Sequence, residues 1–351
     1  MPINTDPAPP KASVSFFLAS GSPKKQAAHS HSVDMVCQED MLISKIRELY
    51  DKISGLDSLK PCQDVDTLFT QLVLTCIPPS PIDVTILPSS LQEIRSNLIR
   101  LCGQAEGLLE SHYSTILSSF ENPLDHLHIF PYYSNYLKLG LLEFTILTQH
   151  CTRAPSKIAF IGSGPLPFTS IVLASHHLPT STFHNYDIDP HANSMALRLF
   201  PSHNDLSKRM VFHTSDIMDV TEDLAEYDVV FLAALVGMDR EEKNRVIDHL
   251  AKYMAPGALL MLRSAHGARA FLYPVVQPGD LRGFEVLSVF HPTDEVINSV
   301  VIAQKYPLPL HSSHDQQGLI LPNKCSEIQV FSPLVSHGNM IEELTVEDHL
   351  S

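Results

Sequence analysis

Two glycines, followed about twenty residues later by an aspartate, have the spacing that most clearly indicates a ligand-binding site. The stretch IAFIGSGPLPFTS, residues 158–170, is a short apolar run followed by Gly162 and Gly164. The chain then reads FHNYDID at residues 183–189, which places Asp187 at the end of a second run. That order predicts a strand, a tight turn, a helix and a second strand ending in an acid. Such a unit holds an adenosine-type ligand, because the glycines let the backbone approach and the carboxylate binds the ribose hydroxyls.

The turn differs from a dinucleotide-binding motif. Pro165 follows Gly164 directly, and Leu166 stands where that motif has its third glycine. Both residues argue against a cradle for pyrophosphate. We therefore expect Gly162 and Gly164 to line the amino-acid portion of the ligand, although paired glycines also occur in turns that are only structural.

Each acid at a strand end has a structural alternative. Asp187 could cap the helix that begins near Pro190, and Asp189 competes for that cap. Asp216, in HTSDIMD at residues 213–219, follows the third predicted strand and is expected near an adenine amino group. Its alternative is again a helix N-cap. Ala233 lies in FLAALVGM, residues 231–238, a fourth strand with a loop expected to face the ligand.

Residues after the fifth predicted strand are candidates for substrate binding. The segment RSAHGARAFLYP, residues 263–274, begins with Arg263 and contains Tyr273. An arginine binds a carboxylate through two parallel hydrogen bonds, so Arg263 is a candidate for a substrate carboxylate. The alternative is a surface salt bridge. Tyr273 is a weaker candidate.

A glutamate far upstream is a candidate base. Glu106 lies between Gly103 and Gly107 on a long predicted helix, and Glu110 lies one turn later on the same face. Most helical glutamates are exposed to solvent. Each interior glycine costs a helix about 1 kcal/mol relative to alanine, so the two glycines suggest close approach of another group or a kink. They favour a functional Glu106.

Several polar side chains open the next predicted helix. Tyr132 and Tyr133 follow Pro131, and Asn135 and Tyr136 continue the polar face. We consider Tyr133 and Asn135 candidates for substrate binding. The tyrosines could equally be part of the core.

The elements that must position these residues follow from the apolar pattern. The strands predicted after residue 155 are 157–161, 181–187, 209–213, 227–233, 257–263, 283–290 and 297–304. Helices fit between the first five, whereas HPTDE at residues 291–295 is too short for a parallel crossover. The sequence therefore predicts an α/β fold: a Rossmann-like, S-adenosylmethionine-dependent methyltransferase-type domain whose parallel sheet is closed by an antiparallel hairpin.

An α-helical domain is expected before the sheet. Helical patterns cover about residues 38–58, 66–75 and 90–118, and residues 128–149 contain another helix after Pro131. We expect a disordered extension at residues 1–36, the helical domain at 37–152, the Rossmann-like domain at 153–306 and a mostly irregular tail at 307–351.

The amino-acid composition limits the possible binding partners and the cellular location of the protein. The net charge of −15 argues against nucleic acid, and no apolar run is long enough for a membrane span. The six cysteines lack metal-ligand spacing, and we expect reduced thiols in a cytoplasmic protein. The nineteen histidines form no zinc motif, so no metal site is expected.

Several longer blocks resemble one family. The chain is similar to plant nicotianamine synthase over about residues 35–306. The blocks that carry this resemblance are MVCQEDMLISKIRELYDKIS, LPSSLQEIRSNLIRLCGQAEGLLESHY, HIFPYYSNYLKLGLLEF, IGSGPLPFTS, NYDIDP, FLAALVGMDREEK and LRSAHGARAFLYPVV. Generic methyltransferases share only the glycine turn and the acids at the strand ends.

The resemblance implies a specific activity. The family condenses three S-adenosylmethionine molecules by aminopropyl (aminocarboxypropyl) transfer and azetidine ring closure, and it releases methylthioadenosine. The product, nicotianamine, is a chelator for the transport of iron and other metals. Glu106 best matches the family's base and Tyr132 its tyrosine, with Tyr133 as the alternative. No cofactor beyond the substrate, and no metal, is implied.

Two other functions remain open at this point. One is a small-molecule methyltransferase that uses the same pocket, and the other is a non-catalytic ligand-binding protein of the same fold. Transfer of the aminocarboxypropyl group needs an amine that has lost its proton, and a carboxylate shielded from water can accept that proton. The choice between these functions depends on how the substrate lies in the pocket.

Overall fold

The computed structural model describes residues 26–80, 82–203 and 205–307. The chain divides into two compact units after Ser44, and the sheet and the candidate site lie in the second. Helix α1 (Gln26–Ser54) begins inside the segment expected to be an extension and upstream of the predicted start near residue 38. Most of the predicted C-terminal tail lies outside the described residues.

Seven strands form one sheet in the order β3-β2-β1-β4-β5-β7-β6. The first five pair in parallel, whereas β7 pairs antiparallel with both β5 and β6. The predicted methyltransferase-type sheet closed by a hairpin is confirmed. The strands are β1 (Lys157–Ile161), β2 (Thr182–Asp187), β3 (Met210–Thr214), β4 (Val229–Leu232), β5 (Leu259–Ser264), β6 (Phe284–Phe290) and β7 (Ser299–Lys305).

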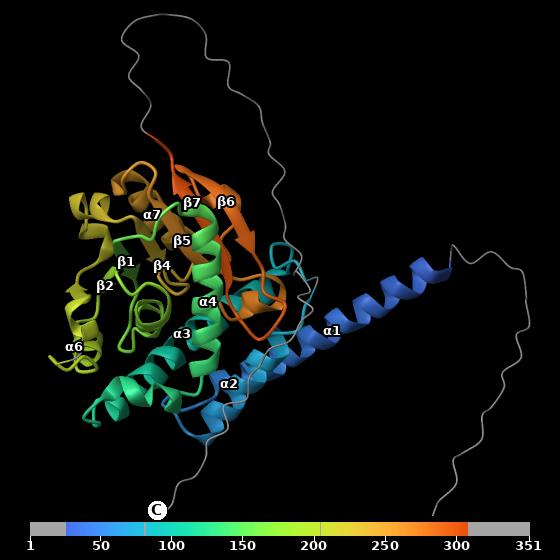
Figure 1. Cartoon of the computed structure of the whole chain (residues 1–351). Helices are drawn as coiled ribbons and strands as arrows, with labels where there is room; N and C mark the ends of the chain where they lie inside the picture. The colour runs from blue at the N-terminus through green and yellow to red at the C-terminus, as the bar shows by residue number, and fades with distance from the viewer. Residues whose placement is uncertain (1–25, 81, 204, 308–351) are drawn as a thin grey trace, which may run out of the picture. The chain divides into compact units, whose positions relative to one another are not determined.

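Alternation along the strands builds a core on each face of the sheet. On β1, Ile158 and Phe160 join one buried cluster, and Ala159 and Ile161 join the other. The first cluster includes side chains of α4 (Tyr133–His150) and α5 (Phe168–Val172), and the second includes side chains of α7 (Arg240–Tyr253). Figure 1 shows α4 in front of the sheet. A mostly parallel sheet with helices packed on both of its faces is typical of a doubly wound α/β fold.

The helices of the N-terminal region match the predicted pattern. They are α2 (Gln63–Cys76), α3 (Ser89–Leu117) and α4, and a 3-10 segment, η1 (Pro123–Ile129), joins α3 to α4. Helix α3 contacts α6 (Pro190–Leu197), which follows β2, and η6 (Gly267–Phe271), which follows β5. The remaining short helical segments are η2 (Leu173–His177), η3 (Asp205–Lys208), η4 (Ile217–Asp219), η5 (Glu222–Glu226) and η7 (Pro278–Asp280).

The strand order reverses between β1 and β4. Loops from these two strands diverge at their carboxyl ends, and open α/β sheets bind ligands in the crevice formed there. The glycine turn follows β1, and Ala233 follows β4. Because α3 touches elements on both sides of this point, it can bring its own side chains to the crevice.

Candidate active site

A cleft of about 840 Å³ lies at the carboxyl edge of the sheet. Its walls come from the glycine turn, the end of β2, the loop after β4 and helix α3. Eight predicted site residues line it. They are Glu106, Gly162, Gly164, Asp187, Asp216, Ala233, Arg263 and Tyr273.

The glycine turn requires glycine at both positions. Gly162 and Gly164 have φ angles of 79° and 66°. A Cβ atom at Gly162 would lie 2.3 Å from Cγ2 of Val236, and one at Gly164 would lie 2.6 Å from Oε2 of Glu110. Glycine adopts this left-handed conformation without steric cost. The turn thus lets the backbone approach both the β4 loop and a glutamate of α3.

Asp187 holds the glycine turn in place. Its carboxylate accepts a hydrogen bond from the backbone N–H of Gly164 at 2.8 Å and one from that of Asp189 at 2.9 Å. Asp189 caps α6 by accepting from the N–H of His191. The alternative in which Asp187 caps the helix is therefore wrong, and its carboxylate lines the cleft.

Asp216 combines both of its predicted positions. It is exposed and lines the cleft, and its side chain also accepts a hydrogen bond from the N–H of Met218 at the start of η4. Ala233 donates its N–H to the carbonyl of Ile161, which joins the β4 loop to β1. Ligand contacts of Asp216 and Ala233 stay predictions.

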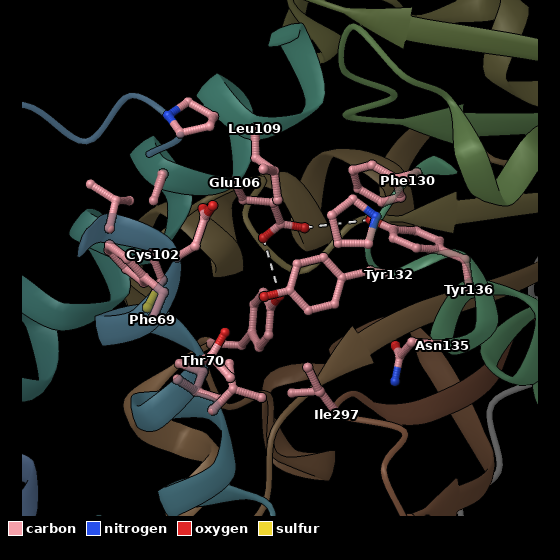
Figure 2. Close-up of a pocket in the computed structure, with 18 of the residues that line it drawn as sticks. Phe69, Thr70, Cys102, Glu106, Leu109, Phe130, Tyr132, Asn135, Tyr136 and Ile297 are labelled. Atoms are coloured by element: carbon pink, nitrogen blue, oxygen red, sulfur yellow. Dashed lines mark hydrogen bonds between the residues drawn. The ribbon is translucent and has the colours of Figure 1, made fainter. Parts of the chain in front are cut away.

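Glu106 accepts hydrogen bonds from two tyrosines. The hydroxyl of Tyr273 donates to its Oε2 at 3.1 Å, and that of Tyr136 lies at the longer distance of 3.5 Å from Oε1 (Figure 2). Burial raises the pKa of Glu106, and the bond from Tyr273, the charge of Arg263 and the bond from Tyr136 oppose the rise. A carboxylate with a raised pKa is suited to accept a proton from an amine.

Glu106 also lines a second cavity of about 230 Å³ (Figure 2). Apolar and aromatic side chains form most of its wall, among them Phe69, Leu109 and Phe130. Four residues line both this cavity and the larger cleft: Glu106, Tyr136, Tyr273 and Asn298. They form the junction between the two spaces, and Glu106 is the carboxylate at that junction.

The carboxyl group of Glu110 also faces the larger cleft. Tyr136 contacts Glu110 at 3.4 Å as well as Glu106, and Glu110 lies over Gly164. Burial, followed by the charge of Glu106, raises the pKa of Glu110 well above its usual range. The sequence predicts Glu110 on the same helical face as Glu106, but no local pattern indicates its contact with the glycine turn.

Arg263 is committed to an internal ion pair. Its guanidinium donates to both carboxylate oxygens of Glu143, at 2.7 Å and 3.1 Å, and to the hydroxyl of Thr169 at 2.6 Å. Glu143 is fully buried and the Arg263 side chain is only 10% exposed, so the expected alternative of a surface salt bridge is wrong. Arg263 lines the cleft, but these bonds occupy most of its donors. A contact with a substrate carboxylate stays a prediction.

Comparison with known proteins places this geometry in a family. The family described as "Nicotianamine synthase protein" matches residues 36–309. The chain belongs to the nicotianamine synthase family. Nicotianamine synthase of Solanum lycopersicum is 64% identical over 318 residues, covering 90% of this chain and all of that protein. Nicotianamine synthase 1 of Arabidopsis thaliana is 57% identical over 317 residues, covering 89% and 99%.

A solved structure shares the fold at lower identity. The crystal structure of MtNAS in complex with MTA and tNA has a TM-score of 0.63 and 24% identity, and the match covers 75% of this chain and 98% of that one. This likeness supports the methyltransferase-type sheet preceded by helices as the fold of this chain.

The tyrosines around Glu106 differ from those expected. Tyr132 and Asn135 line the smaller cavity, and Asn135 donates to the carbonyl of Glu295 at 2.7 Å. Among the described residues, the hydroxyls that reach Glu106 belong to Tyr136 and Tyr273. The pairing of Tyr132 with the base, taken from the nicotianamine synthase family, stays a prediction. Because Tyr136 and Tyr273 contact Glu106 directly, they are stronger candidates.

Tyr133 lies away from the candidate site. It lines neither the cleft nor the smaller cavity, and its ring packs edge-on against Phe168 at a centroid distance of 5.7 Å. The predicted substrate contact of Tyr133 has no support here, whereas the alternative that this tyrosine is part of the core does. One helical step separates Tyr133 from Tyr132, and each step turns a side chain by about 100°.

The described residues provide no evident metal site. Between residues 38 and 307, leaving out residues 81 and 204, no three His, Cys, Asp or Glu side chains are grouped as metal ligands. Within the same ranges no helix is long and apolar enough to cross a membrane.

Replacing Asp187 with alanine is expected to weaken ligand binding. The change removes a carboxylate that faces the cleft and orients Gly164, so we expect affinity for methylthioadenosine to fall by about tenfold to a hundredfold. Calorimetry with methylthioadenosine measures this directly. Asp189→Ala removes a helix cap outside the cleft and is the matched control. An unchanged affinity in Asp187→Ala would contradict a ligand role for this residue.

Replacing Gly107 with a larger residue is expected to raise the stability of the protein and to lower its activity. A Cβ atom there would meet nothing within 4 Å, and the residue lines the cleft. Gly107→Leu should raise the free energy of unfolding by up to about 1 kcal/mol, because glycine is a poor helix former. It should also lower kcat/KM by roughly tenfold, since its side chain enters the substrate's space. Denaturation and steady-state assays test both effects, with Gly107→Ala as the smaller control.

Proposed function

We propose that this chain condenses three S-adenosylmethionine molecules into nicotianamine and releases methylthioadenosine. The observation that carries the proposal is Glu106, a carboxylate with a raised pKa at the junction of two cavities. One cavity has the glycine turn and strand-end acids of an adenosine site, and the other is mostly apolar. Relatives covering most of the chain are named nicotianamine synthase, and the distant MtNAS structure holds MTA and tNA.

The charge of the cleft suits this substrate. Of its lining residues, five are acidic and two are arginines: Glu106, Glu110, Asp187, Asp216 and Glu242 against Arg245 and Arg263. Glu143 already pairs with Arg263. S-adenosylmethionine carries a sulfonium and an ammonium, so an acidic cleft concentrates and holds it.

The chemistry then requires a deprotonated amine. The carboxylate of Glu106 accepts a proton from the ammonium of the acceptor, and the freed nitrogen lone pair attacks Cγ of the donor's methionine moiety. A nitrogen–carbon bond forms as the carbon–sulfur bond breaks, and the sulfur leaves with the electron pair as neutral methylthioadenosine. The sulfonium is already a good leaving group, so we assign no metal to this step. The main task left to the protein is to align nitrogen, carbon and sulfur.

The position of the two cavities supports repeated transfer. We assign the donor to the larger cleft, and the acceptor and growing chain to the smaller cavity beyond Glu106. The same carboxylate then serves each condensation, because it lies at the boundary between them. Closure of the azetidine ring follows when the attacking amine belongs to the same chain as the carbon.

The biological setting forms a further part of the proposal. Nicotianamine carries several amine and carboxylate groups and can chelate iron and other metals, so we infer a role in metal homeostasis. A cytoplasmic location is supported by the scattered cysteines, which show no disulfide framework.

Incubation with S-adenosylmethionine alone tests the proposed function. We expect mass spectrometry to find methylthioadenosine and nicotianamine without an added acceptor. S-adenosylhomocysteine, formed only when an acceptor is supplied, would instead identify a methyltransferase. The absence of any turnover would favour a ligand-binding protein that kept the fold.

A further inference from the structure

Asn298 has an unpartnered amide nitrogen and lines both cavities of the candidate site. It is the last residue of the connection between β6 and β7 and is 7% exposed. Its Nδ2 atom is buried and has no hydrogen-bond partner among the described residues. Leaving a buried donor unpaired lowers stability, so native proteins rarely keep one without a reason. No local sequence pattern indicates this amide, because the apolar pattern of residues 297–304 predicts a strand.

The position of this amide indicates what it could bind. Asn298 lines both cavities, as do Glu106, Tyr136 and Tyr273. At this junction the two tyrosine hydroxyls already contact the carboxylate of Glu106. The Nδ2 group of Asn298 is therefore a donor still free to bind a ligand there.

The complementary group on the substrate is a carboxylate. An ammonium has only donors, so it cannot accept a hydrogen bond from Nδ2. In an α-amino acid, only the Cα atom separates the amine nitrogen from the carboxylate carbon. An amine that faces Glu106 therefore brings its own carboxylate to the same junction. Arg263 is less free to take that carboxylate, because it already binds Glu143 and Thr169.

We propose that Asn298 donates a hydrogen bond to the α-carboxylate of the amino acid whose amine faces Glu106. This role rests on the proposed function, because it requires an amino-acid acceptor at the junction. Asn298 positions the nucleophile, and the proton is taken by Glu106. A polar group kept for the ligand at a cost to the fold predicts opposite effects on binding and stability.

Calorimetry on the full chain with two probes tests this role. Nicotianamine carries α-carboxylates, whereas methylthioadenosine has none. In Asn298→Leu we expect nicotianamine affinity to fall by about tenfold to a hundredfold, as for loss of a hydrogen bond to a charged group. Methylthioadenosine affinity should change less than about twofold, and Tm should stay the same or rise, because the unpaired amide is gone. Asn298→Asp should lower the affinity for nicotianamine further, because the new carboxylate repels the carboxylate of the ligand.

A matched control comes from helix α7. Asn244 also has a buried, unpartnered amide atom, but it lines neither cavity. Asn244→Leu should therefore leave nicotianamine affinity unchanged.

The outcomes separate this role from the proposed function. An unchanged nicotianamine affinity in Asn298→Leu would overturn the role of Asn298. A similar loss of affinity for both nicotianamine and methylthioadenosine, together with a lower Tm, would also overturn it. If the wild type itself neither forms nor binds nicotianamine, the proposed function fails, and the assignment to Asn298 falls with it.

Discussion

Replacing Glu106 with glutamine is expected to lower kcat by about a hundredfold to ten-thousandfold, the usual contribution of a general base. The substitution keeps the shape of the side chain and one oxygen that can accept a hydrogen bond from Tyr136 or Tyr273, but it removes the group that accepts a proton. Methylthioadenosine affinity should stay within about threefold of wild type, because the adenosine part of the cleft is untouched. Single-turnover kinetics and calorimetry measure the two effects separately.

A control and a pH profile sharpen this prediction. Glu93 is exposed on the same helix, so Glu93→Gln should be neutral. The base acts when deprotonated, and burial raises the pKa of Glu106 above its ordinary value of 4.5. Activity should therefore rise with pH through that raised pKa, on an acidic limb that Glu106→Gln lacks. A rate near that of wild type in Glu106→Gln would remove Glu106 from the mechanism.

Replacing Glu143 with alanine is expected to reduce the free energy of unfolding by about 3–5 kcal/mol. The change leaves the guanidinium of Arg263 buried between α4 and β5 without its carboxylate partner. An unpaired buried charge costs more than the pair itself contributes. Urea denaturation, monitored by far-ultraviolet circular dichroism, measures the loss.

The double variant Glu143→Leu with Arg263→Met is the control for this prediction. It replaces both charges with apolar side chains of similar volume, and such replacements of buried pairs are often neutral or stabilising. We expect it to recover most of the stability lost in Glu143→Ala. A single variant as stable as wild type, or a double variant no better than the single, would contradict the account of a paired charge in the core.

The sheet could be predicted from the sequence because its signals are local. Short apolar runs separated by helical lengths indicated parallel strands, and the short connection after residue 290 indicated an antiparallel hairpin. The bounds of β1 (Lys157–Ile161) match the prediction, whereas most other strand ends shifted by one or two residues, as for β3 (Met210–Thr214), which pairs with β2. Helix α1 began earlier than predicted, since helices propagate through residues that lack an amphipathic pattern.

The part of the candidate site that could be predicted has local sequence signals. The glycine turn and Asp187 follow from one strand–turn–helix unit, and both line the cleft. Glu110, Tyr136 and Asn298 come from three separate segments, and only packing of α3 and α4 near the sheet brings them together. Arg263 was expected to face a substrate, but its partner Glu143 lies 120 residues away in sequence. No local pattern could indicate that pair.

In the proposed reaction, Cγ of the methionine moiety is transferred and the methyl group is not. S-adenosylmethionine labelled on its S-methyl group with carbon-13 tests this most directly, with both products analysed by mass spectrometry. We expect all of the label to stay in methylthioadenosine and nicotianamine to carry none. Label on an acceptor, with S-adenosylhomocysteine as the other product, would contradict the proposed reaction.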